Sequence, residues 1–477
     1  MIGKKQHTEP KLFYHGISLD RRIGPDHPLR KIKNTIDFDF IRDHVASLYG
    51  TTGNPSVDPV VILKLIFLLF YEKIKSERAL MSQLPLRLDW LWFCGYDLDD
   101  PTPNHSVLSK ARRRWGTDAF SQFFQNILEQ CIEAGLVDGQ TIHLDSSMID
   151  ANASKEKLQV QLRIVAGDLY NQLEENTENQ EIGKKVSPVD PDARLGKKYG
   201  QTTLGYKDHR TVDDKHGIVT STTTTPANVC DNHILPTAIQ THEANTGKKV
   251  KTAAADKKYG TLENYQYLHD KGCKACIAHQ RHGKKANEQF SHEQFTYDPR
   301  QDSYICPAGE HLELYDRQGP RNGIDWRYRA SRQTCQACAY FSQCVSSKTN
   351  GRQVSRNVRS EYRRWADECL SDHERRSLMA RRRATVEGSF ADAANNHGFK
   401  RARWRGHAMV EIQNLMIAAI QNLRKLVGAS ATRKSSKIGI LAILERAITA
   451  FDHILHKMLS RFGDLVWNIF YKRVLNL

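Results

Sequence analysis

The sequence predicts an α/β protein in which a helical N-terminal region precedes a mixed sheet core, and an insertion divides that core before its last helix. Apolar residues at helical spacing and recognisable helix caps fill residues 1–120. From residue 138 onward, short apolar strands end in acidic residues, a pattern typical of an α/β core. A polar, cysteine-bearing stretch over residues 277–360 then separates these strands from a basic helical stretch around Glu387.

The composition indicates a soluble protein with a polyanionic partner. Lysine and arginine number 70 against 54 aspartate and glutamate residues, which gives a net charge of +16 and a pI near 9.3. Such a surplus favours nucleic acid as the partner. The most apolar run, residues 60–71, is shorter than the roughly 20 residues that cross a membrane, and the first residues lack the apolar stretch of a secretion signal. We therefore expect a cytoplasmic protein with reduced thiols and no membrane partner.

Residues 1–120 are predicted to form a helical domain. Residues 60–74 are nearly all apolar and should form a buried helix, Ser76 should cap a second helix, and Ser106 a third. Two helices joined by a turn, the second strongly basic, are typical of a helix-turn-helix that binds DNA. The alternative is a basic surface helix that packs on acidic neighbours. The DNA-binding candidates on the third helix are Lys110, Arg112 and Arg113.

The first part of the core is expected over residues 138–276. A short strand, residues 141–144, ends at Asp145, with Asp150 as a local rival, and a second strand, residues 249–255, ends at Asp256. Between them lie two runs that should form a hairpin, with Gly217 at a positive φ angle in its loop, and then a helix. Strand, hairpin, helix and strand, with acids at two strand ends, indicate a mixed core of the RNase-H type.

The insertion over residues 277–360 contains four cysteines with one C-x2-C pair. Four thiols in such an arrangement can hold Zn²⁺ tetrahedrally. Buried free thiols are the alternative. The candidate zinc ligands are Cys306, Cys335, Cys338 and Cys344.

The last part of the core, residues 361–427, is predicted to hold the Glu387 helix and a covering helix over residues 409–426. Arg383 lies four residues before Glu387, so an α-helix would place both on one face. One interpretation is an exposed ion pair on a solvated helix. The other is that Glu387 is kept ionised beside a polyanion site, where it can hold a divalent cation. Trp404 could stack on an extruded base or anchor the helix in the core. The DNA-binding candidates of this segment are Arg383, Lys400, Arg401, Arg403, Trp404 and Arg405.

An amphipathic helical tail is expected over residues 438–477. It could pack on the N-terminal domain or mediate self-association.

With these features in place, the chain resembles bacterial insertion-sequence transposases of the DDE class, from about His27 to Leu426. The resemblance depends on the order and spacing of five local strings. These are DPDAR at 190–194, TPANVCD at 225–231, ADKKYG at 255–260, VEGSF at 386–390 and RGHAMVEIQNL at 405–415.

The resemblance implies that Asp145, Asp256 and Glu387 form a catalytic triad that binds two Mg²⁺ (or Mn²⁺) ions. Carboxylate oxygens suit these hard cations, and a metal pair stabilises both the attacking and the leaving oxygen of a phosphodiester. The implied reaction cleaves DNA at terminal inverted repeats and joins the freed 3′-hydroxyls to target DNA. The implied partner is double-stranded DNA, bound by a homodimer.

The sequence departs from that family at two accessory positions. Many relatives carry a Tyr seven residues before the glutamate and a Lys seven residues after it, where this chain has Ala380 and Ala394. Arg383 fits the Arg expected four residues before the glutamate, and Lys400 or Arg401 could replace the missing lysine. A catalytically inactive DNA-binding protein and an RNase-H-like nuclease that does not transpose therefore remain as alternatives.

Overall fold

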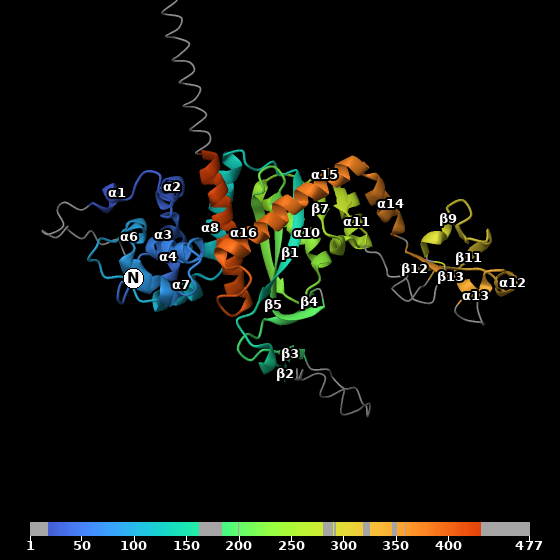
Figure 1. Cartoon of the computed structure of the whole chain (residues 1–477), viewed down its shortest axis with the longest axis horizontal. Helices are drawn as coiled ribbons and strands as arrows, with labels where there is room; N and C mark the ends of the chain where they lie inside the picture. Colours follow the sequence, from blue (N-terminus) through green and yellow to red (C-terminus); the bar gives the residue numbers. More distant parts are fainter. Residues whose placement is uncertain are drawn as a thin grey trace, which may run out of the picture.

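The computed structural model describes residues 18–161, 184–198, 200–279, 290, 292–317, 325–345, 351–357 and 359–430. It confirms a mixed α/β protein. Helices from the N-terminal part lie at one end of the molecule, a twisted sheet with helices lies in the middle, and a small second sheet lies at the other end (Figure 1). The predicted tail over residues 438–477 falls outside the described residues.

In the part of the chain that the structure describes, eight α-helices precede the first strand. Asp58 caps α4 with Pro59 at its first position, and the Ser76 hydroxyl accepts the Ala79 N–H at the start of α5, as predicted. Ser106 is instead the first residue of α7, whose N-cap, His105, forms no side-chain cap. The eight helices are α1 (Leu19–Arg22), α2 (Pro28–Thr35), α3 (Phe40–Val45), α4 (Pro59–Tyr71), α5 (Glu77–Gln83), α6 (Leu88–Cys94), α7 (Ser106–Trp115) and α8 (Asp118–Glu133).

The prediction that a single turn joins the helix capped by Ser76 to the basic helix is wrong. Pro85 lies in a short 3-10 turn that ends the second helix, and α6 then intervenes before the basic helix α7. Proline has no N–H to donate and so favours such a break.

The central sheet combines antiparallel and parallel pairing. Strand β1 pairs antiparallel with β5 on one side and parallel with β7 on the other, and β7 pairs parallel with β8. The far edge of β5 pairs antiparallel with β6 and β4. These strands are β1 (Thr141–Asp150), β4 (Arg194–Lys198), β5 (Gln201–Asp213), β6 (Val219–Pro226), β7 (Thr252–Ala255) and β8 (Lys274–Ile277).

The connections follow the predicted order. The β5–β6 hairpin turns at Gly217, whose φ of +67° confirms the predicted left-handed position. Helix α10 (Leu235–Thr246) leads to β7, and α11 (Leu262–Asp270) leads to β8. A short two-stranded sheet, β2 (Gln159–Gln161) and β3 (Lys184–Val186), extends from the end of β1.

Strand β1 is longer than the sequence predicted. The expected strand ended at Leu144, but β1 continues to Asp150, so Asp145 lies in mid-strand. The parallel ladder between β1 and β7 nevertheless stops at the pair Leu144–Ala255. The antiparallel partner β5 continues beside β1 and explains the extra length.

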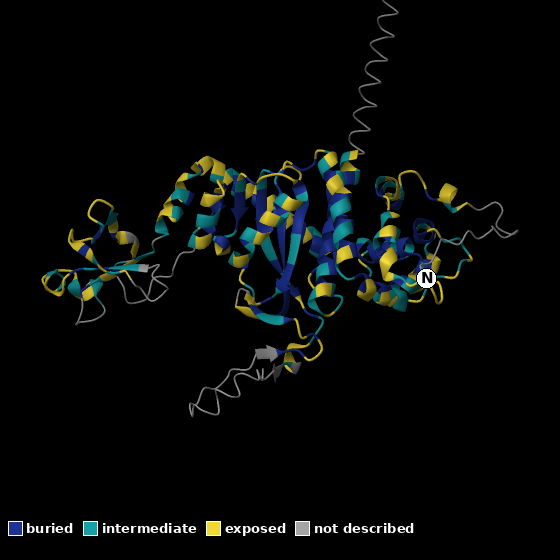
Figure 2. Cartoon of the chain, turned by 180° about the vertical axis from the view of Figure 1, so that it is seen from behind, coloured by how far each residue is buried: buried dark blue, intermediate teal, exposed yellow. Residues whose placement is uncertain are grey.

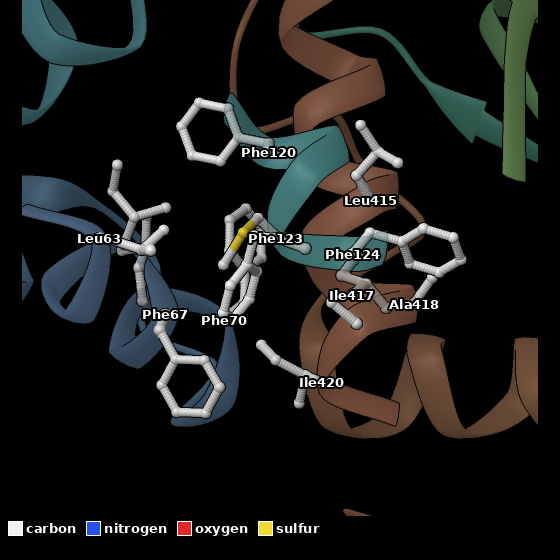
Figure 3. Packing of buried hydrophobic residues seen from close by; sticks show 14 of the residues in the cluster. Leu63, Phe67, Phe70, Phe120, Phe123, Phe124, Leu415, Ile417, Ala418 and Ile420 are labelled. Atoms are coloured by element: carbon white, nitrogen blue, oxygen red, sulfur yellow. The ribbon is translucent and has the colours of Figure 1, made fainter. Parts of the chain in front are cut away.

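The main apolar core joins the N-terminal helices to the C-terminal part of the chain. A helix over residues 407–430 lies against α4 and α8, and its apolar side chains meet theirs in one cluster (Figure 3). The same cluster includes Ile149 of β1 and Tyr206 of β5. The N-terminal helices therefore share their core with the sheet and the covering helix (dark blue in Figure 2).

The described part of the insertion forms a second, antiparallel sheet with a small core of its own around Leu312 and Tyr328. Its strands are β9 (Thr296–Asp298), β10 (Ser303–Ile305), β11 (His311–Asp316), β12 (Asp325–Arg329) and β13 (Gln353–Asn357), accompanied by α12 (Arg332–Gln336) and α13 (Phe341–Cys344). Helices α14 (Ser360–Glu368) and α15 (Asp372–Arg382) lead the chain back to the central sheet.

The Glu387 segment is not a uniform α-helix. Helix α15 begins with a capping box formed by Ser371 and Glu374. It passes into a π-helical turn, η8 (Arg383–Glu387), and then into α16 (Gly388–His397). Across the described part of the chain, none of the helices is long and apolar enough to span a bilayer.

Candidate active site

One pocket of about 550 Å³ brings together the three acids that the sequence singled out. Asp145 comes from β1, Asp256 from the end of β7 and Glu387 from the end of the π-helical turn. These residues are more than 100 positions apart in the chain. The rest of the lining consists of Ser146, Ser147, Lys197, Asp231, Lys257, Lys258, Arg382 and Phe390.

The pairing of β1 with β7 positions the two aspartates. Asp145 and Asp256 are the residues that follow the last paired positions, Leu144 and Ala255. Neighbouring strands lie about 4.8 Å apart, so the two carboxylates start from adjacent points of the sheet. Each also accepts a backbone N–H, from Ser146 (2.8 Å) and from Lys257 (2.7 Å). The rival Asp150 lies exposed at the far end of β1 and does not line the pocket.

A buried arginine connects the first and third acids. Arg382 is 5% exposed, and its Nη2 atom lies 2.8 Å from Asp145 Oδ2. Its Nη1 atom lies 3.8 Å from Glu387 Oε1, and its Nε–H donates to the Leu144 carbonyl at 3.3 Å. The guanidinium therefore lies between the two carboxylates and is fixed to β1.

Arg382, the residue before Arg383, is the arginine that approaches Glu387 across the π-helical turn. An α-helix brings residues i and i+4 together, whereas a π-helical turn closes an i to i+5 hydrogen bond. The extra residue moves Arg382, five positions before Glu387, to the face of the pocket. Arg383 is left exposed. α-Helical spacing could not reveal Arg382.

Lysines line the same pocket. Lys257 and Lys258 follow Asp256 directly, and Lys197 reaches the pocket from β4. Lys400 donates from Nζ to the Ser147 hydroxyl at 2.7 Å, so this exposed candidate lies beside the pocket. Cations around three acids favour a polyanionic ligand. The two lysines after Asp256 were the signal for this side of the pocket, which the sequence analysis did not use.

Asp231 is a fourth acid in the pocket that the sequence analysis missed as a site residue. It is buried, and it pairs with Lys207 at 2.9 Å and Lys258 at 3.4 Å. Burial alone would raise the pKa of Asp231, but the hydrogen bond and charge of Lys207 outweigh it and lower the pKa. Asp231 therefore stays ionised and orients a pocket lysine.

A buried ion pair connects the sheet to the Glu387 helix. Arg210 of β5 pairs with Asp208 at 2.7 Å, and neither side chain is exposed. The Nη1 group of Arg210 donates to the Ser389 hydroxyl and to Gln421, both at 2.8 Å. Because Ser389 lies two residues after Glu387, this network fixes the start of α16 relative to the sheet.

The predicted DNA-binding residues divide into exposed and internal ones. Arg112 is buried, pairs with Glu77 and lies 3.7 Å over the Trp404 ring, and burial lowers its pKa although Glu77 opposes this. Trp404 meets Phe70 edge to face, which is the anchor alternative. Burial also lowers the pKa of Arg403 to about 10. These three residues hold the helices together. The exposed candidates are Lys110, Arg113, Arg383, Lys400, Arg401 and Arg405.

The four insertion cysteines surround a second, much smaller pocket of about 30 Å³. Cys306 lies at the β10–β11 turn, and Cys335, Cys338 and Cys344 lie on or beside α12 and α13. Burial raises the pKa of the Cys344 thiol, and the three neighbouring thiols add to the effect against the charge of Arg352. All four thiols are free.

Neither pocket presents a complete metal-binding group in this structure. Among the described residues, no three His, Cys, Asp or Glu side chains are arranged so that they could hold a metal ion. In the acid pocket, the Arg382 guanidinium lies between two of the acids. The donor types nevertheless match their expected cations, carboxylate oxygens for Mg²⁺ and thiolates for Zn²⁺.

The fold and the pocket define a class of mixed α/β proteins with an acid-lined, lysine-flanked pocket where the parallel strands of a sheet end. Comparison with known proteins then shows which families parts of the chain match. Residues 17–114 match a transposase domain (DUF772), and residues 305–427 match a transposase DDE domain. The second match includes Glu387 and the four cysteines, but neither Asp145 nor Asp256.

A curated relative supports the same assignment. Over 153 residues, the chain is 30% identical to the transposase for insertion sequence element IS1106 of Neisseria meningitidis serogroup B. The alignment covers 32% of this chain and 46% of that relative, which is less than half of its length. Together, the three matches show that this chain is related to insertion-sequence transposases of the DDE class.

Two solved transposase structures are also similar to parts of the chain. A piggyBac transposase synaptic complex with hairpin DNA superposes with a TM-score of 0.29 at 9% identity, covering 90% of this chain and 84% of that one. A Mos1 transposase paired-end complex with the left transposon end gives a TM-score of 0.16 at 9% identity, covering 73% and 82%. Scores this low carry no argument about the fold.

Proposed function

We propose that this protein is a DNA transposase that cleaves at the terminal inverted repeats of an insertion sequence and joins the 3′-hydroxyl ends to target DNA. The convergence of Asp145, Asp256 and Glu387 on one lysine-flanked pocket carries the proposal. A polyanionic substrate suits such a pocket in a chain of net charge +16. The kinship with DDE transposases favours phosphoryl transfer on DNA over other reactions of polyanions.

The sheet topology supports an RNase-H-like core. In chain order, the first, second and third main strands form an antiparallel group, β1, β5 and β6, and β7 and β8 then add in parallel on the other side of β1. Asp145 and Asp256 lie where the parallel pairing of β1 and β7 ends, the edge at which α/β sheets place ligands. Both features match the core that the sequence predicted.

The donor set of the acid pocket fits two Mg²⁺ or Mn²⁺ ions. Asp145, Asp256 and Glu387 would hold them through carboxylate oxygens. Bound divalent cations would stabilise charge on the attacking and leaving oxygens of the phosphodiester. The chain itself would supply Lys197, Lys257 and Lys258 to attract DNA phosphates, and the Arg210 network to keep α16 in place.

Asp145→Asn tests this function. We expect strand cleavage at the inverted repeats to fall at least about a thousandfold, while binding to the same DNA changes less than about threefold, because the amide keeps the shape but loses the ligand charge. Cleavage is measured on labelled end DNA with Mg²⁺, and binding by fluorescence anisotropy with Ca²⁺. Equal loss of binding and cleavage would contradict the assigned role.

A catalytically inactive DNA-binding protein is the second candidate. Ala380 and Ala394 replace two accessory side chains that many relatives carry near the glutamate, which favours this reading. It predicts salt-sensitive DNA binding without nicking at any Mg²⁺ or Mn²⁺ concentration. A strand-transfer assay with pre-cut ends distinguishes a transposase from a plain nuclease, because a nuclease would give no joined product.

We further propose that DNA contacts the exposed cations beside the pocket and on α7. Lys400, Arg401 and Arg405 follow the Glu387 helix, and Lys110 and Arg113 lie on α7. The proposal keeps the predicted division of the chain. Residues 1–120 would bind DNA, residues 138–276 and 361–427 would form the catalytic core, and residues 277–360 would form the insertion.

Because transposition brings two ends together, we expect a homodimer on DNA, measurable by light scattering with and without end DNA.

The cysteine pocket is proposed as a structural zinc site. Its lining is apolar apart from a few groups such as Glu310 and Arg352, so thiolates from Cys306, Cys335, Cys338 and Cys344 are its main metal donors. Zinc binding requires the thiols to close in from their present positions. Metal analysis of the purified protein should give about one zinc ion per chain. An unaltered protein whose insertion is fully folded without zinc would remove the proposal.

A further inference from the structure

Arg382 lies in the position between two acids that a divalent cation would share. It contacts Asp145 at 2.8 Å with one nitrogen and approaches Glu387 at 3.8 Å with the other. Its side chain is 6% exposed, whereas the Glu387 side chain is 57% exposed, so the glutamate stands on the open side of the pocket. The guanidinium is thus the inner partner of both carboxylates.

A guanidinium and a divalent cation cannot share these carboxylates without mutual repulsion. Both are cations, and in a partly buried pocket the repulsion between them is stronger than in water. The metal-loaded pocket therefore favours an Arg382 that has turned to another anion. A DNA phosphate is the natural alternative, because the arginine fork binds phosphate oxygens in pairs.

We propose that Arg382 is a positioning residue that substitutes for the cation in the DNA-free protein, and that a DNA phosphate draws it away to admit the metal. This inference depends on the proposed function. Metal binding and DNA binding are then positively coupled through one side chain, and by linkage each increases the affinity of the other by the same factor. In the DNA-free protein, Arg382 keeps Asp145 and Glu387 in place, and divalent cations bind weakly.

Three features make Arg382 suited to this exchange. The Nε–H bond to the Leu144 carbonyl holds the stem of the guanidinium against β1, at the last residue before Asp145. The π-helical turn that starts at Arg383 points Arg382 inward, in place of its exposed neighbour. The pocket beside it is wide enough for a phosphate, and Lys257 and Lys258 line it.

The experiment measures Mn²⁺ affinity with and without DNA. Free Mn²⁺ is followed by its electron paramagnetic resonance signal, and the probe DNA is a duplex carrying the inverted repeat that flanks the coding region. Titration of the DNA alone provides the correction for Mn²⁺ held by phosphates. For the unaltered protein, we expect DNA to tighten Mn²⁺ binding by about tenfold beyond that correction.

Substitution of Arg382 should remove the coupling. In Arg382→Gln we expect Mn²⁺ to bind about tenfold tighter than in the unaltered protein without DNA, and DNA to add less than about threefold. Arg382→Lys keeps the positive charge but loses the planar guanidinium. Its Mn²⁺ affinity and its coupling to DNA should lie between those of the unaltered protein and Arg382→Gln. The matched control is Arg376→Gln, which removes an exposed arginine from the same helix α15 and should keep the full coupling.

Two outcomes separate the inference from the proposed function. Equal coupling by DNA in the unaltered protein and in Arg382→Gln would overturn the role of Arg382 alone, provided that Asp145→Asn still weakens Mn²⁺ binding. Mn²⁺ binding that ignores Asp145→Asn would overturn the proposed function itself. Should Arg382→Gln fail to fold, judged by circular dichroism, Arg382→Lys and the coupling in the unaltered protein still decide the question.

Discussion

The acid pocket and the cysteine pocket both bring together side chains that lie far apart in the sequence, but the two pockets lie on different sheets. The acid pocket, about 550 Å³, lies on the central sheet and is lined by carboxylates and lysines. The cysteine pocket, about 30 Å³, lies on the small insertion sheet among apolar side chains. The first has room for a polyanion, and the second has room for one ion at most.

The two pockets also differ in what supports them. The acid pocket is supported by a fully buried ion pair, Arg210 with Asp208, which connects it to α16. The cysteine pocket belongs to a separate apolar cluster around Tyr328. We therefore expect damage to the acid pocket to stop chemistry, and damage to the cysteine pocket to remain local.

The largest expected effect is on cleavage, from Asp256→Asn. We expect cleavage to fall at least about a thousandfold, because one carboxylate ligand becomes an amide. The zinc content should stay unchanged. Gel assays of end cleavage and metal analysis of the same preparation measure the two quantities. The matched control, Asp270→Asn at the exposed end of α11, should cleave normally, and a comparable loss in it would break the comparison.

The next effect is on stability, from Arg210→Met. Removing one partner of a buried pair leaves Asp208 charged and unpaired, so the free energy of unfolding should fall by about 3–5 kcal/mol. Urea denaturation measures it. The double variant Arg210→Met/Asp208→Leu should recover most of the loss. An exposed control, Arg376→Met, should stay within about 0.5 kcal/mol. No loss in Arg210→Met would show that the pair does not support the pocket.

A pH effect should follow from His209 on β5. This histidine is buried, and burial lowers its pKa from 6.5 to about 4, against the charges of Asp231 and Asp208. Between pH 6.5 and about 4, the unfolded chain takes up a proton that the folded chain does not. The free energy of unfolding should therefore fall as the pH falls through this window, by at most about 3 kcal/mol.

His209→Gln isolates that contribution. Its side chain can still bond to the Thr225 hydroxyl, which lies 2.9 Å from His209 Nε2. Urea denaturation at pH 7 and at pH 4.5 should show a smaller loss of stability on acidification in the variant than in the unaltered protein. His143, His242 and His397 have lowered pKa values for the same reason and remain in both proteins. An identical loss in both would exclude His209 as a source.

The smallest expected effect on cleavage comes from Cys338→Ser. Zinc should be lost, and hydrogen exchange should rise in β9–β13, because a structural site loses a ligand. Cleavage should stay within about twofold, since the insertion has its own core. Cys230→Ser, at an exposed thiol outside the insertion, is the control and should keep its zinc. A strong loss of cleavage in Cys338→Ser would show that the two pockets depend on each other.

Much of the fold could be predicted because its signals are local. The apolar run of α4, the Ser76 cap and Gly217 in the hairpin each need only a few neighbouring residues. Other features depend on distant partners. Strand β1 extends past Leu144 because β5 pairs with it, and the N-terminal helices have no separate core because helix 407–430 completes theirs.

The sequence by itself determined the class of this protein, since residue types and their order indicated a basic, mixed α/β chain with three separated acids and kinship to DDE transposases. Only the tertiary structure decided which arginine meets those acids. A π-helical turn admits Arg382 and exposes Arg383. The tertiary structure also turned Arg112 and Trp404 inward. The physical reason is that composition and periodicity are properties of short segments, whereas burial and side-chain partners depend on segments hundreds of residues apart.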